Sequence, residues 1–66
     1  MDLNTYLNKR VQIVLINGFT YIGLVIQVDD NSLDLIDKTN SKVSLKESSI
    51  NFIKELKWKL KKELNW

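Results

Sequence analysis

The chain has 66 residues, ten Lys or Arg against eight Asp or Glu, and a formal net charge of +2. This length allows one domain, and a domain so small buries only roughly 60% of the surface that its unfolded chain exposes. Because the sequence has no cysteine and no histidine, we exclude disulfides and the usual structural metal sites and expect oligomerisation to supply the missing stability.

The same two absences limit the chemistry that the chain can perform. It cannot build a Ser-His-Asp or Cys-His nucleophile, a zinc finger or a haem ligand set. We therefore expect no catalysis, cofactor, metal or small-molecule substrate. No apolar run reaches the ~18 residues of a transmembrane helix, and the N-terminal charges follow the apolar residues, unlike those of a secretory signal. These features predict a soluble, cytoplasmic protein.

The N-terminal third predicts a short helix and a β-hairpin. Residues 2–8 suit a helix in which Asp2 is the cap and Leu3, Tyr6 and Leu7 form an apolar stripe. Residues 10–16 are rich in β-branched side chains and lead into Asn17-Gly18, a strong hairpin signal.

The second strand of this hairpin is predicted at residues 19–28. Its even positions, from Thr20 to Val28, are mostly apolar and predict the core face. Gly23 lies at an odd position, on the opposite face, where a long strand could bend sharply.

Three further strands are predicted, each preceded by a polar turn. The turn at 29–32 leads to a strand at 33–36, the turn at 37–41 to a short strand at 42–45, and residues 46–49 to a short strand at 50–53. The fold class is thus mainly β, a short helix followed by five antiparallel strands in a strongly bent, partly open barrel.

The C-terminal segment is ambiguous in its periodicity. Leu56, Trp58 and Leu60 alternate as in a strand, whereas Ile53, Leu56, Leu60 and Leu64 fall on one helical stripe. Leu, Lys and Glu are strong helix formers, so the composition favours an amphipathic, basic helix. We predict a domain at 1–54 and a C-terminal helix at 55–66.

Residues 3–54 resemble the Sm-like family, which includes Sm and LSm proteins and bacterial Hfq. The first motif of that family is matched by Val11, Leu15, Gly18, Gly23, Val25, Val28 and Asp29, and its second motif by Leu45, Lys46 and Ile50. The resemblance implies an SH3-like barrel that forms a homo-oligomeric ring, with the fourth strand of one subunit pairing with the fifth of its neighbour. The subunit interface would then include Val43, Leu45, Ile50 and Phe52.

The resemblance also implies a binding site for single-stranded RNA at the centre of the ring, formed by the loops after the second and fourth strands. Those loops are residues 29–32 and 46–48, and the candidate RNA-binding residues in them are Asp29, Asp30, Asn31, Lys46 and Ser48. Lys46 stands where the family has an arginine that stacks on or bonds to a base. Lys57, Trp58 and Lys61 of the basic tail are candidates for an auxiliary RNA contact.

Other interpretations stay open. Asp29, Asp30 and Asn31 also suit a solvated turn, and Lys46 an exposed loop position. The tail can pack on the barrel, contact nucleic acid or lie on a membrane surface. For the chain as a whole, we expect a homo-oligomeric ring that binds RNA. The alternatives are a ring-forming protein-interaction scaffold whose RNA site has decayed, and a peripheral membrane protein that binds through its basic tail.

Overall fold

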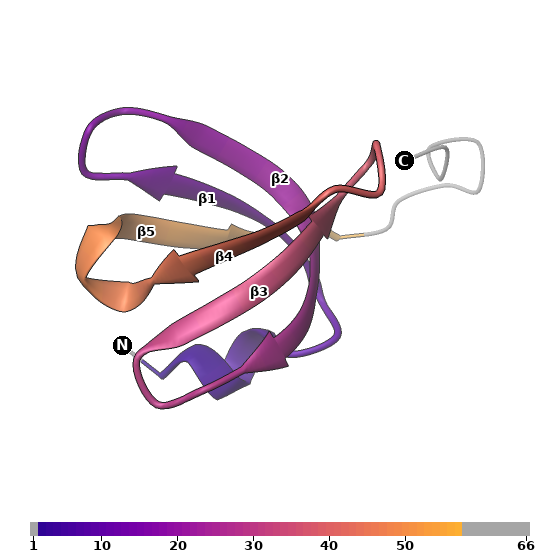
Figure 1. Cartoon of the computed structure of the whole chain (residues 1–66), viewed down its shortest axis with the longest axis horizontal. Coiled ribbons are helices and arrows are strands. Elements are labelled where there is room, and N and C mark those ends of the chain that lie inside the picture. The colour runs from indigo at the N-terminus through magenta and orange to yellow at the C-terminus, as the bar shows by residue number, and fades with distance from the viewer. Residues whose placement is uncertain (1, 58–66) are drawn as a thin grey trace.

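The computed structural model describes residues 2–57 and contains five strands and two short 3-10 helices (Figure 1). In chain order these are η1 (Leu3–Tyr6), β1 (Arg10–Leu15), β2 (Thr20–Val28), β3 (Ser32–Asp37), β4 (Lys42–Lys46), η2 (Glu47–Ser49) and β5 (Ile50–Glu55). The predicted class, a mainly β fold with an N-terminal helix and five antiparallel strands, is confirmed.

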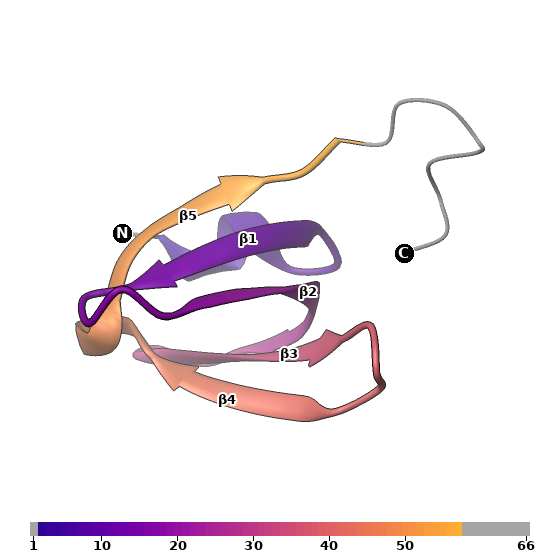
Figure 2. The same ribbon diagram turned by 90° about the horizontal axis from the view of Figure 1, so that it is seen from above.

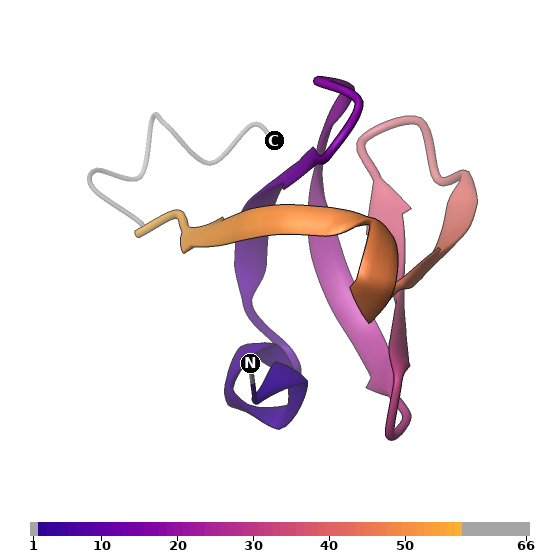
Figure 3. The ribbon, with the colours of Figure 1, turned by 90° about the vertical axis from the view of Figure 1, so that its left-hand side faces the viewer.

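All five strands belong to one antiparallel sheet of order β4-β3-β2-β1-β5. In the view from above, β4 and β5 lie on opposite sides of the molecule with the other strands between them (Figure 2). Figure 3 shows β5 running across the other strands at a steep angle. The sheet therefore bends around the core but is not closed, and β4 and β5 are its two edges.

One face of the bent sheet encloses a small apolar core. Ile13, Val11, Val25 and Leu35 are fully buried in it, and Leu3 of η1 covers its end with only 3% of its surface exposed. Asp2 caps η1, as predicted, by accepting a hydrogen bond of 3.1 Å from the backbone N–H of Asn4. The capped turn thus holds one apolar side chain over the core.

The hairpin predicted at Asn17-Gly18 is confirmed. Gly18 donates its backbone N–H to the carbonyl of Leu15 and has a φ of +91°, and the side chain of Asn17 accepts a hydrogen bond from Phe19 N. Leu15 N donates to Phe19 O across the turn. A type I turn followed by a left-handed glycine is a common hairpin connection.

The prediction of the core face of β2 is wrong for residues 20–26, whereas Val28, beyond a register shift between Val25 and Gln27, packs against the core as predicted. The odd residues Tyr21, Gly23 and Val25 face the core, whereas Ile22 and Leu24 are 48% and 39% exposed on the outer face. The partner strands decide this orientation, because Val11 and Ile13 of β1 lie opposite Gly23 and Tyr21. Both faces of β2 are apolar, so counting apolar positions could not separate them.

Two other expectations need correction. The fifth strand is not short, since β5 has six residues, the same number as β1.

The predicted helix at 55–66 does not begin where expected, because Glu55 belongs to β5 and residues 56–57 have no helical structure. β5 is extended to Glu55 by its ladder with β1, which outweighs the helix propensity of the sequence. Residues 58–66 lie outside the described residues.

Candidate nucleic-acid interface

Two loops predicted to form a site, at residues 29–32 and 46–48, meet at one end of the β3–β4 ladder. Ser32 at the start of β3 pairs with Lys46 at the end of β4. One step further along, the backbone N–H of Glu47 donates a hydrogen bond of 2.7 Å to the carbonyl of Asn31. Asp29 N donates to Ser32 O over 2.8 Å and closes the loop. Strand pairing thus joins residues that are about fifteen positions apart in the sequence.

The junction forms two adjoining open pockets. The first has a volume of about 600 Å³ and is lined by Asn31, Ser32, Lys46, Glu47 and Ser48. The second, of about 440 Å³, lies beside Asp29 and Asp30 and also includes Asn4 of η1. Asn31 and Ser32 line both pockets and connect them. All five predicted RNA-binding residues therefore lie in one continuous surface.

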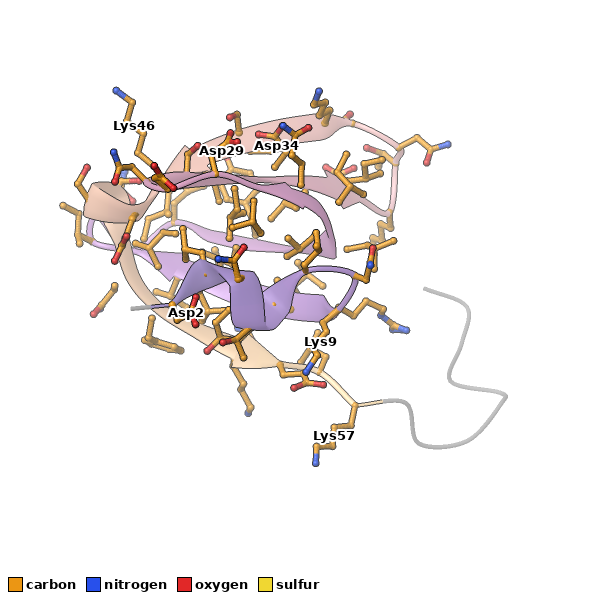
Figure 4. All side chains as sticks on the ribbon, turned by 90° about the horizontal axis from the view of Figure 1, so that it is seen from below. Asp2, Lys9, Asp29, Asp34, Lys46 and Lys57 are labelled. Carbon is orange, nitrogen blue, oxygen red and sulfur yellow. The ribbon has the colours of Figure 1, made fainter. Side chains whose placement is uncertain are left out.

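The side chains of this surface can hydrogen-bond in several ways. The exposed Asn31 amide offers both donors and an acceptor, Ser48 a hydroxyl, and Lys46 an ammonium group. Figure 4 shows Lys46 extending away from the ribbon. η2 is held in place because the hydroxyl of Ser49 donates a hydrogen bond of 2.8 Å to the carbonyl of Lys46. The hydrogen-bonded turn thus presents exposed polar groups to solvent.

The charge of the surface is mainly negative. Asp29, Asp30 and Glu47 contribute three carboxylates against the single ammonium group of Lys46. Such a surface repels a phosphate group more than it attracts one. Its amide and hydroxyl groups can instead form hydrogen bonds with an uncharged ligand group, such as the edge of a nucleobase.

The auxiliary residues lie elsewhere or outside the described part of the chain. Figure 4 shows Lys57 at the opposite end of the molecule from Lys46. Trp58 and Lys61 lie outside the described residues. Lys57 therefore does not contribute to the surface formed by the two loops of its own chain.

The four predicted interface residues all lie on the edge strands, Val43 and Leu45 on β4, Ile50 and Phe52 on β5. Leu45 and Ile50 are each 7% exposed and belong to the core of the single chain, whereas Phe52 is 48% exposed. Any contact of Leu45 or Ile50 with a neighbouring subunit would therefore involve mainly the backbone of its edge strand.

The sequence placed Ser32 and Glu47 in the two loops without selecting them as RNA-binding residues, and it did not indicate Asn4 at all. Ser32 and Glu47 line the same pocket because the register of β3 and β4 brings the two loops together. Asn4 enters only because η1 packs beside the loop after β2. No sequence signal near Asn4 indicates that contact.

Within residues 2–57, no group of three acidic side chains could hold a metal ion. In the same part of the chain, no helix has the length and apolar character required to cross a membrane. A scan against models of known protein families finds no match, and a search of curated proteins finds no similar sequence.

Proposed function

We propose that this chain is an Sm-like protein that assembles into a homo-oligomeric ring and binds single-stranded RNA without catalysis. The observation that carries the proposal is the meeting of the loop after β2 with the segment after β4, joined by the hydrogen bond from Glu47 to Asn31. These are the two segments in which Sm-like proteins hold RNA.

A nucleotide would be recognised mainly through its base. The Asn31 amide can pair with the donor and acceptor groups on the edge of an unpaired base, and the Ser48 hydroxyl can add a further bond. Lys46 would lie over the base or bond to its carbonyl oxygen. The carboxylates of Asp29 and Asp30 weaken any contribution from phosphate, so each subunit would contribute little and repetition around the ring would supply the affinity.

The ring is supported by the two open edges of the sheet. Within residues 2–57, β4 pairs only with β3 and β5 only with β1, so each edge strand leaves one side of its backbone unpaired. Exposed edges favour pairing with other chains, and head-to-tail pairing of β4 with β5 would satisfy both edges if the assembly closes. The same pairing would bring one copy of the pocket from each subunit around a common axis.

Binding of labelled oligo(U) and oligo(A) at two salt concentrations tests RNA recognition. We expect Lys46→Ala to weaken oligo(U) binding roughly tenfold, the size of one charge-assisted hydrogen bond. Lys38→Ala, in the turn at the other end of the β3–β4 ladder, removes the same charge and should leave affinity unchanged. Absence of oligo(U) binding at low salt would overturn the proposal for RNA.

A protein-interaction scaffold is the second candidate, because Asp29, Asp30 and Glu47 place three carboxylates around one lysine. A ring repeats these charges and would present an acidic surface that suits a basic protein segment better than RNA. An oligomeric mass in native mass spectrometry together with no RNA binding would favour this function. A monomeric mass at micromolar concentration would contradict the ring in both cases.

A further inference from the structure

The outer face of the sheet carries an uncovered apolar stripe along β2. Ile22, Leu24 and Ile26 follow one another at alternate positions and are 48%, 39% and 37% exposed. Ile36 of β3 lies opposite Leu24 and extends the stripe sideways. Contiguous apolar surface of this kind on a small protein usually marks a contact with another segment.

The position of β2 makes this stripe unusual. β2 is the middle strand of the sheet, two strands away from either edge. A strand that is apolar on both faces, as β2 is, is typical of strands covered on both sides. Pairing of edge strands between subunits would join sheets side by side and leave the outer face of β2 uncovered, so assembly through the edges would not cover this stripe.

The chain leaves the sheet beside this stripe. Leu56 donates its backbone N–H to the carbonyl of Arg10 over 2.8 Å, and Arg10 in turn lies opposite Leu24. An open pocket of about 350 Å³ has Arg10, Leu24, Leu56 and Lys57 among its lining residues. Lys57, the last described residue, is therefore next to the middle of the stripe.

The segment that follows has the composition and length to cover the stripe. Residues 58–66, WKLKKELNW, include four large apolar side chains, Trp58, Leu60, Leu64 and Trp66, and three lysines. Nine residues span roughly 13 Å as a helix and about 30 Å when extended. The stripe from Ile22 to Ile26 is about 13 Å long at ~3.3 Å per strand residue, so the segment can reach all of it.

We propose that residues 58–66 dock on the outer face of β2 in their own chain, with Trp58 and the leucines against Ile22, Leu24 and Ile26 and the lysines in water. The covalent link favours residues 58–66 over a segment of a separate molecule, because it gives them a high effective concentration next to the stripe. Docking of this segment would bury the apolar surface that one sheet face alone leaves exposed. The tail would then be a structural layer of the domain instead of an RNA contact.

Tryptophan fluorescence of the full chain tests this docking, because Trp58 and Trp66 are the two tryptophans of the protein. We expect the native emission maximum at a shorter wavelength than that of the chain unfolded in urea, with weaker quenching by acrylamide. Leu24→Gln should reduce the ratio of docked to undocked segment roughly tenfold, the equivalent of losing the burial of one partly exposed leucine, and move both signals toward the unfolded values.

Ile16→Gln is the matched control, since Ile16 is 71% exposed in the hairpin turn and away from the stripe. It should leave emission and quenching as in the wild type. Far-UV circular dichroism verifies that each variant retains its β-sheet. Native emission and quenching equal to those of the unfolded chain would overturn the proposal, as would an unchanged signal in folded Leu24→Gln.

A second variant leaves the sheet intact and changes only the segment. Leu60→Gln combined with Leu64→Gln should increase binding of an apolar fluorescent dye to the folded protein, because the stripe on β2 becomes accessible. Unchanged dye binding would contradict docking even if Leu24→Gln fails to fold. Blue-shifted emission that disappears on dilution to monomer would show that a second copy is the occupant and would also overturn the proposal.

Discussion

Gly23 of β2 lies directly against the backbone of Ile36 in β3. A Cβ added to Gly23 would lie 2.6 Å from the carbonyl oxygen of Ile36 and 2.6 Å from Cδ1 of Leu35. Because the carbonyl oxygen belongs to the neighbouring strand, it can move away only if the ladder distorts. We expect Gly23→Ala to lower the free energy of unfolding by about 1–3 kcal/mol. Urea unfolding at fixed protein concentration measures the change as a lower midpoint with an unchanged slope.

Gly18→Asn is the control for this substitution. Gly18 has a φ of +91°, but an added Cβ would have nothing within 4 Å, and asparagine tolerates left-handed backbone better than most residues. Because a side chain at this φ strains the backbone, we expect a loss of about 1 kcal/mol from that strain alone, without a steric clash. Equal urea midpoints for Gly23→Ala and the wild type would show that β2 and β3 do not approach this closely.

The turn between β3 and β4 lowers the pKa of Asp37. The Thr39 hydroxyl donates to Asp37 Oδ1 over 2.6 Å, and the backbone N–H groups of Ser41 and Thr39 donate over 3.1 Å and 2.9 Å. Mainly through the Thr39 hydroxyl, these bonds hold the pKa of Asp37 below its ordinary value of 3.8. Since the folded state favours the charged carboxylate, this stabilisation is present above the unfolded pKa and is lost as pH falls through the folded pKa.

Thr39→Val removes the hydrogen bond that lowers the pKa of Asp37 most, and it keeps the shape of the side chain. We expect the pKa of Asp37 to rise toward its ordinary value, which NMR titration of the carboxyl carbon measures directly. Thr39→Ser restores a hydroxyl and should keep the pKa lowered. An identical pKa in the wild type and Thr39→Val would show that the Thr39 hydroxyl does not bond to the charged carboxylate.

The elements of this fold were predictable where local chemistry decides them, and not where packing between strands does. Asp2 as a cap and Asn17-Gly18 as a turn depend on neighbouring residues, and both are found as expected. The core face of β2 depends on Val11 and Leu35, which pair with it from other parts of the chain. In the same way, the loop after β2 was recognisable, but its contact with Glu47 follows from the register of β3 and β4.

Asn31 should contribute to RNA binding without contributing to its salt dependence. Its amide is neutral, so Asn31→Ala should weaken oligo(U) binding roughly tenfold while the slope of log affinity against log salt stays unchanged. Loss of a phosphate contact would instead reduce that slope by about 0.7. The substitution should not unfold the loop, because Asn31 accepts the bond from Glu47 through its backbone carbonyl.

Asn51→Ala is the matched control for this test, since Asn51 is exposed on β5, away from the pocket. It should leave both affinity and slope unchanged. A reduced slope in Asn31→Ala would show that the nucleic acid is held there through phosphate, and equal affinity for Asn31→Ala and the wild type would remove Asn31 from the site.

The β4 edge offers a direct test of assembly at Ser44. Asp37 N donates to Ser41 O at one end of the β3–β4 ladder, and Glu47 N donates to Asn31 O at the other. Hydrogen-bonded and non-hydrogen-bonded pairs alternate in an antiparallel ladder, so the backbone N–H of Ser44, opposite Asp34, is directed to the open side of β4.

Ser44→Pro should therefore remove a donor that pairing between subunits would use, while the bonds between β4 and β3 stay intact. We expect native mass spectrometry to show a shift from the oligomer to the monomer, with a β-sheet circular dichroism spectrum retained. Ser44→Ala loses the same hydroxyl bond of 2.7 Å to Asp34 but keeps the backbone N–H, and should remain oligomeric. If folded Ser44→Pro keeps the wild-type oligomeric mass, subunits do not associate through the open side of β4 at this residue.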